Sequence, residues 1–331
     1  MPQLPPQARL LTLAISYLVP RALHVIVQLG VADHLSDEPM DAAALAAATG
    51  TGALPDRLNR LLRLLAAHGV FEPTEDGRFA HNAVSLLLRR DHPQSMRDFI
   101  LMVGGPVRWK SAGELRNTVL TGETGISKVF GKEVFDFYAA DLDEGAMFDR
   151  AMRAKAQDDI AATLAAYDFS GAGLIIDVGG GSGHLLAEIL KGGGQGVLFE
   201  LPAVAERLRS AGAHPFKIVT GDFFADPLPA GDTYLLMQVL HDWADREATE
   251  ILAATRRAAK PGARLLVIEM LVPAENAPHP ALLLDTLMMV MTGGRERTKA
   301  EFSDMMATAG WRLDRVIPMG GPMVILEAIS A

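Results

Sequence analysis

The chain has 331 residues, of which 49% are hydrophobic and 21% are charged, with a formal net charge of -9 and no cysteine. This length favours two compact units over a single core, and the acidic balance argues against nucleic acid or an anionic membrane surface as a partner. The lack of cysteine excludes disulfides, thiolate metal sites and thiol nucleophiles. A small-molecule partner is therefore favoured, and the chemistry must come from other side chains.

The segment 10–32 is the most apolar part of the sequence. Pro20 and Arg21 lie at its middle, where a charge would be costly in a bilayer, and the segment lacks the basic start of a secretory signal. We expect two helical pieces, broken near Pro20, whose apolar faces pack against a second copy of the chain. A membrane span is the alternative, and a cytoplasmic location without a membrane partner is the expectation.

Residues 41–82 follow the order helix, helix and hairpin that is typical of a winged helix. Asp41 is the expected N-cap of a helix that ends near Gly50, and leucines at helical spacing mark the second helix. Asp76-Gly77 marks the hairpin turn. The second helix also carries three arginines, Arg57, Arg60 and Arg63. They would contact phosphates in a DNA-binding protein, but the acidic chain favours a solvent-exposed face of an interaction domain.

The segment 95–168 is expected to be mainly helical, interrupted by loops at 104–106 and 121–125. The predicted helices are 96–102, 134–142 and 147–166. Bulky side chains in this segment are candidates for a substrate pocket, because pockets favour domain interfaces, and plain core packing is the alternative. The candidates are Trp109, Phe148 and Met152.

From residue 174 onward, short apolar runs alternate with helical segments. The expected strands are 174–178, 197–200, 216–219, 234–240 and 264–270, and the expected helices between them are 183–191, 204–211 and 245–259. This alternation predicts a parallel sheet that is covered on both faces. A helix at 299–309 is followed by strands at 313–317 and 323–329, which are expected to form an antiparallel hairpin.

The run Asp177–Gly183 lies directly between an expected strand and an expected helix. Glycines at such a place let the backbone come close to a ligand. The frame G-x-G-x-x-G of NAD-binding folds fails here, because its third position is His184. The frame D-x-G-x-G-x-G fits, and the carboxylate of Asp177 would repel a pyrophosphate but attract a cationic amino-acid group. The sequence therefore predicts a sulfonium nucleoside, held at Gly179 and Gly181, in preference to NAD.

Polar side chains stand at or just after the ends of all five expected strands, namely Asp177, Glu200, Asp222, His241 and Glu269. Ligands of parallel sheets bind outside the carboxyl ends of the strands, so these side chains should meet in one crevice. Glu200 is expected to accept hydrogen bonds from both ribose hydroxyls. Asp222 is expected to accept one from an adenine amino group, with Phe223 against the ring. For one such acid alone, helix capping would be the simpler role.

Four motifs together resemble those of the plant caffeate and bacterial natural-product O-methyltransferase family, namely 177–183, 221–224, 241–243 and 294–298. The resemblance covers nearly the whole chain and implies an α/β fold. It implies a Rossmann-like class I methyltransferase domain at 166–331, with a seven-stranded, mostly parallel sheet. An N-terminal winged-helix dimerisation domain at 1–100 and a helical pocket region at 101–165 would precede it. A homodimer that uses S-adenosylmethionine is therefore expected.

The resemblance also implies roles for single residues. His241 matches the base that deprotonates the acceptor hydroxyl, and Glu269 and Glu296 match two glutamates that steer the histidine and the substrate. The expected cofactor contacts are Asp177, Gly179, Gly181, Glu200, Leu201, Asp222, Phe223 and Gln238. The expected substrate contacts are Asp242, Asp285 and Met289, in addition to Trp109, Phe148 and Met152. Two positions depart from the family pattern: Glu200 replaces the usual Asp, and Met237 stands where many relatives have Lys or Ser.

No metal is expected, because a sulfonium is a strong leaving group and transfer needs only in-line placement and removal of the acceptor proton. Asp245 is expected to cap the helix 245–259 and not to bind a metal. Two other functions stay open. One is a cofactor-retaining relative with hydroxylase or decarboxylase chemistry, and the other is a winged-helix regulator that senses the nucleoside. The retention of His241 with both glutamates favours methyl transfer.

Overall fold

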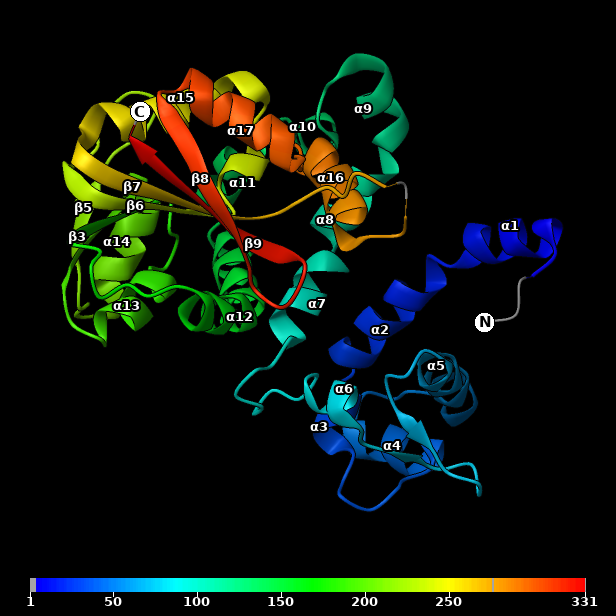
Figure 1. Ribbon diagram of the computed structural model, residues 1–331. Helices are drawn as coiled ribbons and strands as arrows, with labels where there is room; N and C mark the ends of the chain where they lie inside the picture. The colour runs from blue at the N-terminus through cyan, green and yellow to red at the C-terminus, as the bar shows by residue number, and fades with distance from the viewer. Residues whose placement is uncertain (1–3, 276, 331) are drawn as a thin grey trace. The chain divides into compact units, whose positions relative to one another are not determined.

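The computed structural model describes residues 4–275 and 277–330 (Figure 1). The chain divides into two compact units, the first running to Trp109 and including Ala146–Lys155, the second comprising Lys110–Gly145 and the chain from Ala156 onward. The helical region expected at 101–165 is thus shared between the two units. The expected boundaries near residues 100 and 165 stay predictions, and the outermost residues 1–3 and 331 lie outside the described residues.

The first unit is helical apart from one small hairpin. Its elements are α1 (Pro6–Ile15), α2 (Leu18–Gln28), α3 (Val31–His34), α4 (Ala42–Thr49), α5 (Pro55–Ala67), β1 (Glu72–Pro73), β2 (Phe79–Ala80), α6 (Ala83–Leu86) and α7 (Arg97–Val103). The side chain of Asp41 accepts a hydrogen bond from the amide of Ala44 at 2.8 Å and so caps α4. The hairpin closes around Asp76-Gly77, with Glu72 paired to Ala80. The winged-helix pattern is confirmed.

The two helical pieces are confirmed, but the break between them lies at Ser16-Tyr17, shortly before Pro20. Pro20 is the third residue of α2, where the missing amide proton would have no helical partner anyway. Four apolar side chains of α1 are 60–69% exposed, namely Leu10, Leu11, Leu13 and Ile15. By length and composition alone, Pro6–Gln28 is apolar enough to cross a membrane. An exposed apolar face of this kind is equally what a protein–protein interface requires.

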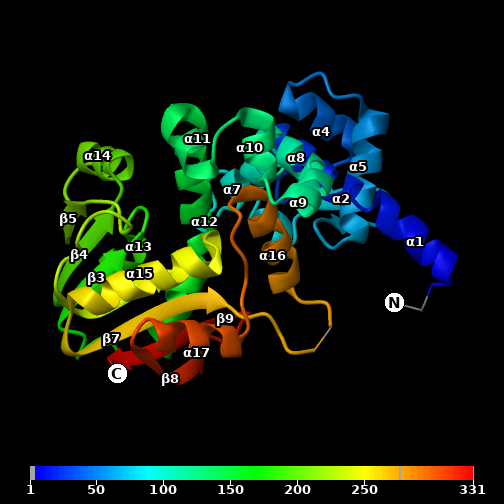
Figure 2. The ribbon, with the colours of Figure 1, turned by 90° about the horizontal axis from the view of Figure 1, so that it is seen from above.

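The second unit contains a seven-stranded sheet in the order β5-β4-β3-β6-β7-β9-β8, in which β9 runs antiparallel to its two neighbours, β7 and β8. Figure 2 shows the strands running from β5 at one edge to β8 at the other. The strands are β3 (Leu174–Val178), β4 (Gln195–Glu200), β5 (Lys217–Thr220), β6 (Gly231–Met237), β7 (Ala259–Met270), β8 (Trp311–Pro318) and β9 (Met323–Ser330). This is the mostly parallel sheet that the sequence predicted.

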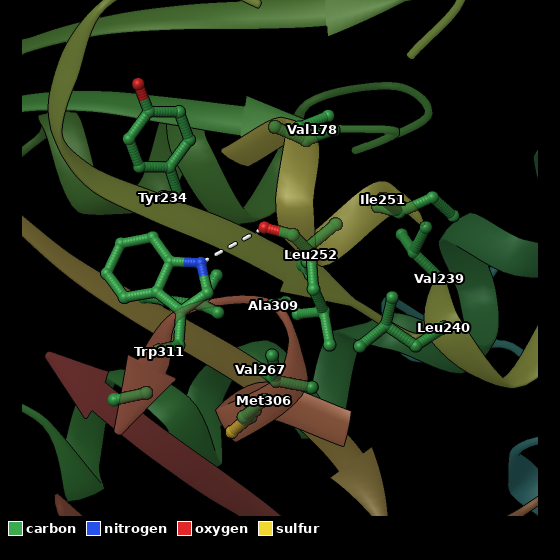
Figure 3. Close-up of a cluster of buried hydrophobic side chains, with 14 of the residues drawn as sticks. Val178, Tyr234, Val239, Leu240, Ile251, Leu252, Val267, Met306, Ala309 and Trp311 are labelled. Carbon is green, nitrogen blue, oxygen red and sulfur yellow. Dashed lines mark hydrogen bonds between the residues drawn. The ribbon is translucent and has the colours of Figure 1, made fainter. Parts of the chain in front are cut away.

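Helices cover both faces of this sheet, with α15 (Asp245–Ala258) and α17 (Lys299–Thr308) on one face and α12 (Leu142–Ala166) and α13 (His184–Leu190) on the other (Figure 1). The alternation of strand side chains produces the two cores, since Ile176 packs toward α15 and Ile175 toward α13. Figure 3 shows the first core around Trp311, whose indole nitrogen donates to the carbonyl oxygen of Leu252 at 3.1 Å.

The remaining helices of the chain are α8 (Pro106–Gly113), α9 (Leu115–Thr121), α10 (Gly125–Phe130), α11 (Val134–Ala140), α14 (Pro202–Ala211) and α16 (Pro280–Met291). The sequence did not predict α8, α9 and α10, which are short and lie between glycines that looked like loop signals. The strand expected at 234–240 is too long. It ends at Met237, and a single 3₁₀ turn, η1 (Leu240–Asp242), follows.

Candidate active site

The glycine-rich loop after β3 makes a close turn over the end of the strand. Gly179 and Gly181 have φ values of 66° and 59°, which favour glycine. A Cβ atom at Gly180 would lie 2.2 Å from Oδ2 of Asp177, so a side chain has no room there. The loop amide of Gly181 donates to Oε1 of Glu200 at 2.8 Å, which joins the loop to the end of β4. The loop thus presents bare backbone at the carboxyl edge of the sheet.

Asp177 lies beneath this loop and is almost fully buried, with a relative exposure of 1%. Neither of its carboxylate oxygens has a hydrogen-bond partner among the described residues. Burial, and to a smaller extent the charge of Glu200, raise its pKa to about 7. A buried carboxylate is stable only when it is paired, hydrogen-bonded or neutralised. The site is therefore suited to a cationic or hydrogen-donating ligand group.

The side chain of Glu200 is oriented by backbone amides at the end of β4. Besides the bond from Gly181, its Oε2 atom accepts from the amide of Leu201 at 2.7 Å. Both oxygens are thereby fixed at the carboxyl edge of the sheet. Leu201 itself is 40% exposed beside this carboxylate, at the start of α14.

Asp222 and Phe223 follow β5 at the same edge. One oxygen of Asp222 accepts a hydrogen bond from the amide of Phe224 at 2.9 Å, so part of its capacity serves the local turn. The ring of Phe223 lies 3.7 Å from the position that a Cβ atom of Gly179 would occupy. It also makes an edge contact with Trp243, at 5.7 Å between ring centroids. The glycine loop and the Phe223 ring therefore lie side by side.

Gln238 follows Met237, the last residue of β6, and has a left-handed backbone conformation. It is the one non-glycine residue with positive φ (53°) in the described chain, a conformation that costs on the order of 1–3 kcal/mol. Its side-chain nitrogen donates to Oδ2 of Asp159 on α12 at 3.0 Å. This hydrogen bond ties the amide of Gln238 to the protein, and its expected contact with the cofactor stays a prediction.

His241 lies in η1, buried between two glutamates from different parts of the sheet edge. Its Nδ1 atom is 2.7 Å from Oε1 of Glu296 and 3.7 Å from Oε2 of Glu269. Its Nε2 atom is 3.9 Å from Oδ1 of Asp242. The short contact with Glu296 indicates that Nδ1 carries a hydrogen, which leaves Nε2 as the nitrogen that can accept a proton.

Glu269 holds the backbone of the turn that carries His241. Its Oε1 atom accepts from three successive amides, those of Val239, Leu240 and His241, at 3.1, 3.0 and 3.4 Å. The left-handed Gln238 turns these amides toward the end of β7. Burial raises the pKa of Glu269 to about 7, against the opposing effect of His241. One carboxylate thus determines the shape of the turn, and its Oε2 atom has no hydrogen-bond partner in the described chain.

The pKa of His241 reflects the same cluster. Burial alone would lower it, because it disfavours the charged imidazolium, but the carboxylates of Glu269, Asp242 and Glu296 outweigh this effect and raise the pKa to about 9. Carboxylates so close to an imidazole stabilise its protonated form. The arrangement therefore makes His241 a stronger base than a free imidazole.

Comparison with known proteins shows to which family the chain belongs. It matches the O-methyltransferase dimerisation domain over residues 11–91 and the O-methyltransferase domain over residues 112–312. It is 37% identical to a phenazine O-methyltransferase of Lysobacter antibioticus over 326 residues, which cover 96% of this chain and 95% of that protein. The chain belongs to the O-methyltransferase family.

The fold of this methyltransferase also matches solved structures of relatives that hold the cofactor. Human N-acetylserotonin methyltransferase in complex with SAM matches with a TM-score of 0.89 and 27% identity, over 100% of this chain and 99% of that one. An O-methyltransferase from neocarzinostatin biosynthesis, in complex with S-adenosyl-L-homocysteine and 1,4-dihydroxy-2-naphthoic acid, matches with a TM-score of 0.74 and 33% identity, over 94% and 96%. S-adenosylmethionine is therefore the cofactor, and the glycine loop with the unpaired Asp177 and the fixed Glu200 fits it.

Asp285 is the expected substrate residue for which a different role is visible. Oδ1 of Asp285, on α16, accepts a hydrogen bond from the amide of Glu296 at 2.9 Å, so this acid helps to position the glutamate. Met289 is half-buried on the same helix, and Asp242 lies beside His241. Trp109, Phe148 and Met152 belong to the first unit, whereas the His241 cluster belongs to the second. The substrate contacts of all six residues stay predictions.

Asp245 does not cap α15, and that expectation is wrong. Ala244 is the N-cap residue, and Asp245 is the first helical residue, with its carboxylate 2.9 Å from Nε of Arg297 and 3.3 Å from Arg295. The sequence did not indicate this role of Arg297, because a single arginine in a polar motif looks solvent-exposed. A fully buried arginine two positions after an exposed one could only be recognised from the fold.

The donor atoms of His241, Glu269 and Glu296 all lie within 4.8 Å of one another, close enough to surround a metal ion. The contacts argue for a proton-transfer cluster instead. Glu296 already bonds to His241, and one oxygen of Glu269 is occupied by three amides. The absence of a metal from the reaction stays a prediction of the sequence.

Proposed function

We propose that this O-methyltransferase methylates a hydroxyl group of an aromatic or polyketide-like small molecule, with His241 as the general base. The observation that carries the proposal is the 2.7 Å contact between Nδ1 of His241 and Glu296, which leaves Nε2 free to take a proton. The acceptor class rests on relatives such as the phenazine O-methyltransferase and the structure with 1,4-dihydroxy-2-naphthoic acid bound.

The chemistry requires little of the protein beyond placement and proton removal. S-adenosylmethionine supplies a methyl group on a sulfonium sulfur, so the acceptor oxygen forms a bond to carbon as the carbon–sulfur bond breaks and its electrons go to sulfur. Nε2 of His241 takes the hydroxyl proton, and Glu296 stabilises the resulting imidazolium through Nδ1. A positioned base of this kind contributes roughly 10²- to 10⁴-fold to the rate.

The pKa of His241, about 9, is close to that of an ordinary phenol, about 10. Proton transfer between groups of similar pKa is nearly balanced in free energy, which suits general-base catalysis. The same pKa keeps most of the histidine protonated at pH 7. We therefore expect an enzyme whose activity rises into the alkaline range.

We further propose that the enzyme is a cytoplasmic homodimer that acts in secondary metabolism, without a nucleic-acid or membrane partner. The match to the dimerisation domain and the exposed leucines of α1 support the dimer. Light scattering at micromolar concentration should give about twice the 35.5 kDa chain mass. A monomer under these conditions would reject this part of the proposal.

The direct test is incubation of the purified enzyme with methyl-labelled S-adenosylmethionine and a panel of phenols, naphthols and phenazinols. Matched methyl ethers of the same compounds serve as controls that offer no free hydroxyl. We expect label in the phenolic products and none in the controls. Cofactor binding without label transfer to any hydroxyl would instead favour a relative that retains the cofactor for other chemistry.

A further inference from the structure

Arg297, which directly follows Glu296, is fully buried with a relative exposure of 0%. A guanidinium in the protein interior is stable only when its donors are paired, because its desolvation is costly. Its ion-pair partner Asp245 has a side chain that is 63% exposed, so this pair alone offers little compensation. The reason for burying this charge must lie in its other contacts.

Those contacts are with the backbone of the turn that holds the base. Nη1 of Arg297 donates to the carbonyl oxygen of Leu240 at 2.8 Å, and Nη2 donates to that of Trp243 at 2.7 Å. These two carbonyls stand on either side of His241 and Asp242. A planar fork with fixed donors can span both positions, which a single ammonium group cannot.

The turn is therefore held from two sides by opposite charges. The carboxylate of Glu269 binds its amide groups, and the guanidinium of Arg297 binds its carbonyl groups. The neighbouring Glu296 binds the imidazole ring itself. Two adjacent residues, Glu296 and Arg297, thus fix the ring and the backbone of His241 together.

We infer that Arg297 is a positioning residue for methyl transfer, which fixes the backbone on both sides of His241 so that the base meets the acceptor hydroxyl. This inference rests on the proposed role of His241. Misplacing a catalytic group by about 1 Å can cost about 100-fold in rate. Arg297 would then matter for proton removal and hardly at all for the cofactor, which binds at other residues.

The test compares R297K with two acceptors, one phenol with a pKa near 10 and one already ionised at the assay pH. R297K keeps the charge but loses the fork, so we expect kcat for the neutral phenol to fall about 10- to 100-fold. For the ionised acceptor, which needs no base, the loss should be at least fivefold smaller. The affinity for S-adenosylhomocysteine should stay within about twofold of wild type. R295K, at the exposed neighbouring position, is the matched control and should behave as wild type.

A second variant, D245N, covers the case in which R297K does not fold. It weakens the contact at Nε of Arg297, together with the exposed ion pair of Asp245 with Arg295, and leaves the two carbonyl contacts of Arg297 in place. A smaller loss with the same preference for the ionised acceptor is therefore expected. Equal losses for both acceptors, or unchanged kcat in a folded R297K, would overturn the positioning role. These outcomes differ from failure of the proposed function, in which H241A itself would keep its activity on the neutral phenol.

Discussion

The turn that carries His241 (residues 238–243, the base turn) and the glycine loop 177–183 with Glu200 (the cofactor edge) lie at the same end of one sheet. They differ in how their buried polar groups are paired. At the base turn, Glu269, Glu296 and Arg297 each bind protein atoms that define the place of His241. At the cofactor edge, Asp177 is equally buried, yet both of its oxygens lack a hydrogen-bond partner among the described residues. Contacts within the chain fix the turn around His241, whereas the carboxylate of Asp177 has no such contacts among the described residues.

This difference has an energetic meaning. A group that is held by several protein contacts is preorganised and needs no rearrangement during the reaction. A buried acid without partners lowers the stability of the free protein, and a ligand that pairs with it gains affinity by removing that cost. Mutations at the two regions should therefore have opposite consequences for stability and activity.

The largest effect is expected for H241A at the base turn. Loss of the base should reduce kcat on a phenol roughly 10²- to 10⁴-fold, while the affinity for S-adenosylhomocysteine stays near wild type, because His241 acts only on the acceptor proton. Steady-state kinetics and calorimetry would measure the two quantities. H68A, at an exposed position on the first unit, is the control. A variant that loses cofactor affinity and kcat together would erase the distinction between the regions.

A smaller effect is expected for D177N at the cofactor edge. If the carboxylate binds the cationic end of the cofactor, its loss should weaken cofactor affinity about 10- to 100-fold, the range for hydrogen bonds to charged groups. The free protein should become more stable, by roughly 2–4 °C in melting temperature, because the substitution removes the charge that an unpaired buried carboxylate carries.

D232N provides the contrast to D177N. Asp232 accepts from the amide of Leu174 and from Lys260, and these partners lower its pKa. Its loss should lower the melting temperature and leave cofactor affinity unchanged. If D177N instead lowers the stability of the free protein, Asp177 has structural partners and the interpretation of the cofactor edge is wrong.

The pH dependence should show a further difference between wild type and E296Q. In the free enzyme kcat/KM should rise with pH until His241 loses its proton, at a pKa of about 9. Glu296 stabilises the imidazolium, so replacing its charge should lower the pKa of His241 and move the rising limb to lower pH. The maximal rate should also fall about tenfold, because the ring loses its charged partner. A rising limb that stays at the same pH in E296Q would point to a different ionising group.

The smallest effect is expected from removal of divalent cations. His241, Glu269 and Glu296 are close enough to hold an ion, but the imidazole already bonds to Glu296, and one oxygen of Glu269 already accepts from backbone amides. Activity after exhaustive chelation should equal that of untreated enzyme. A loss that magnesium or manganese restores would replace the proton-transfer interpretation by a metal site.

Much of this site could be predicted because its signals are local. The order of apolar runs predicted the parallel sheet. The glycines of Asp177–Gly183 predicted the loop over the strand end, and the structure shows that a side chain at Gly180 would collide with Asp177. The resemblance to the O-methyltransferase family identified His241, Glu269 and Glu296 as one set. The structure brings these three residues together. For His241 and Glu269 this follows from strand ends at a common edge, whereas Glu296 was expected only from the resemblance.

The features that the sequence did not predict depend mainly on contacts between residues that are distant in sequence. The strand expected at 234–240 ends early because Gln238 adopts a left-handed conformation, and the three amides that justify it bind Glu269, about 30 positions later. Asp245 was expected to cap its helix, but its carboxylate accepts a hydrogen bond from Arg297, which lies 52 positions later in the sequence. The break near Pro20 is displaced for a local reason, since Pro20 is the third residue of α2 and proline is tolerated in the first turn of a helix.

The central claim is that His241 removes the acceptor proton at a preformed turn. Its most direct test is the ratio of the wild-type rate to the H241A rate. Initial rates of wild type and H241A would be measured on a series of phenols whose pKa values run from below the assay pH to about 10. We expect the ratio of the wild-type rate to the H241A rate to be small for acceptors that arrive ionised. It should rise to about 100 or more for the least acidic phenols. A ratio that stays constant across the series would show that His241 contributes to something other than proton removal.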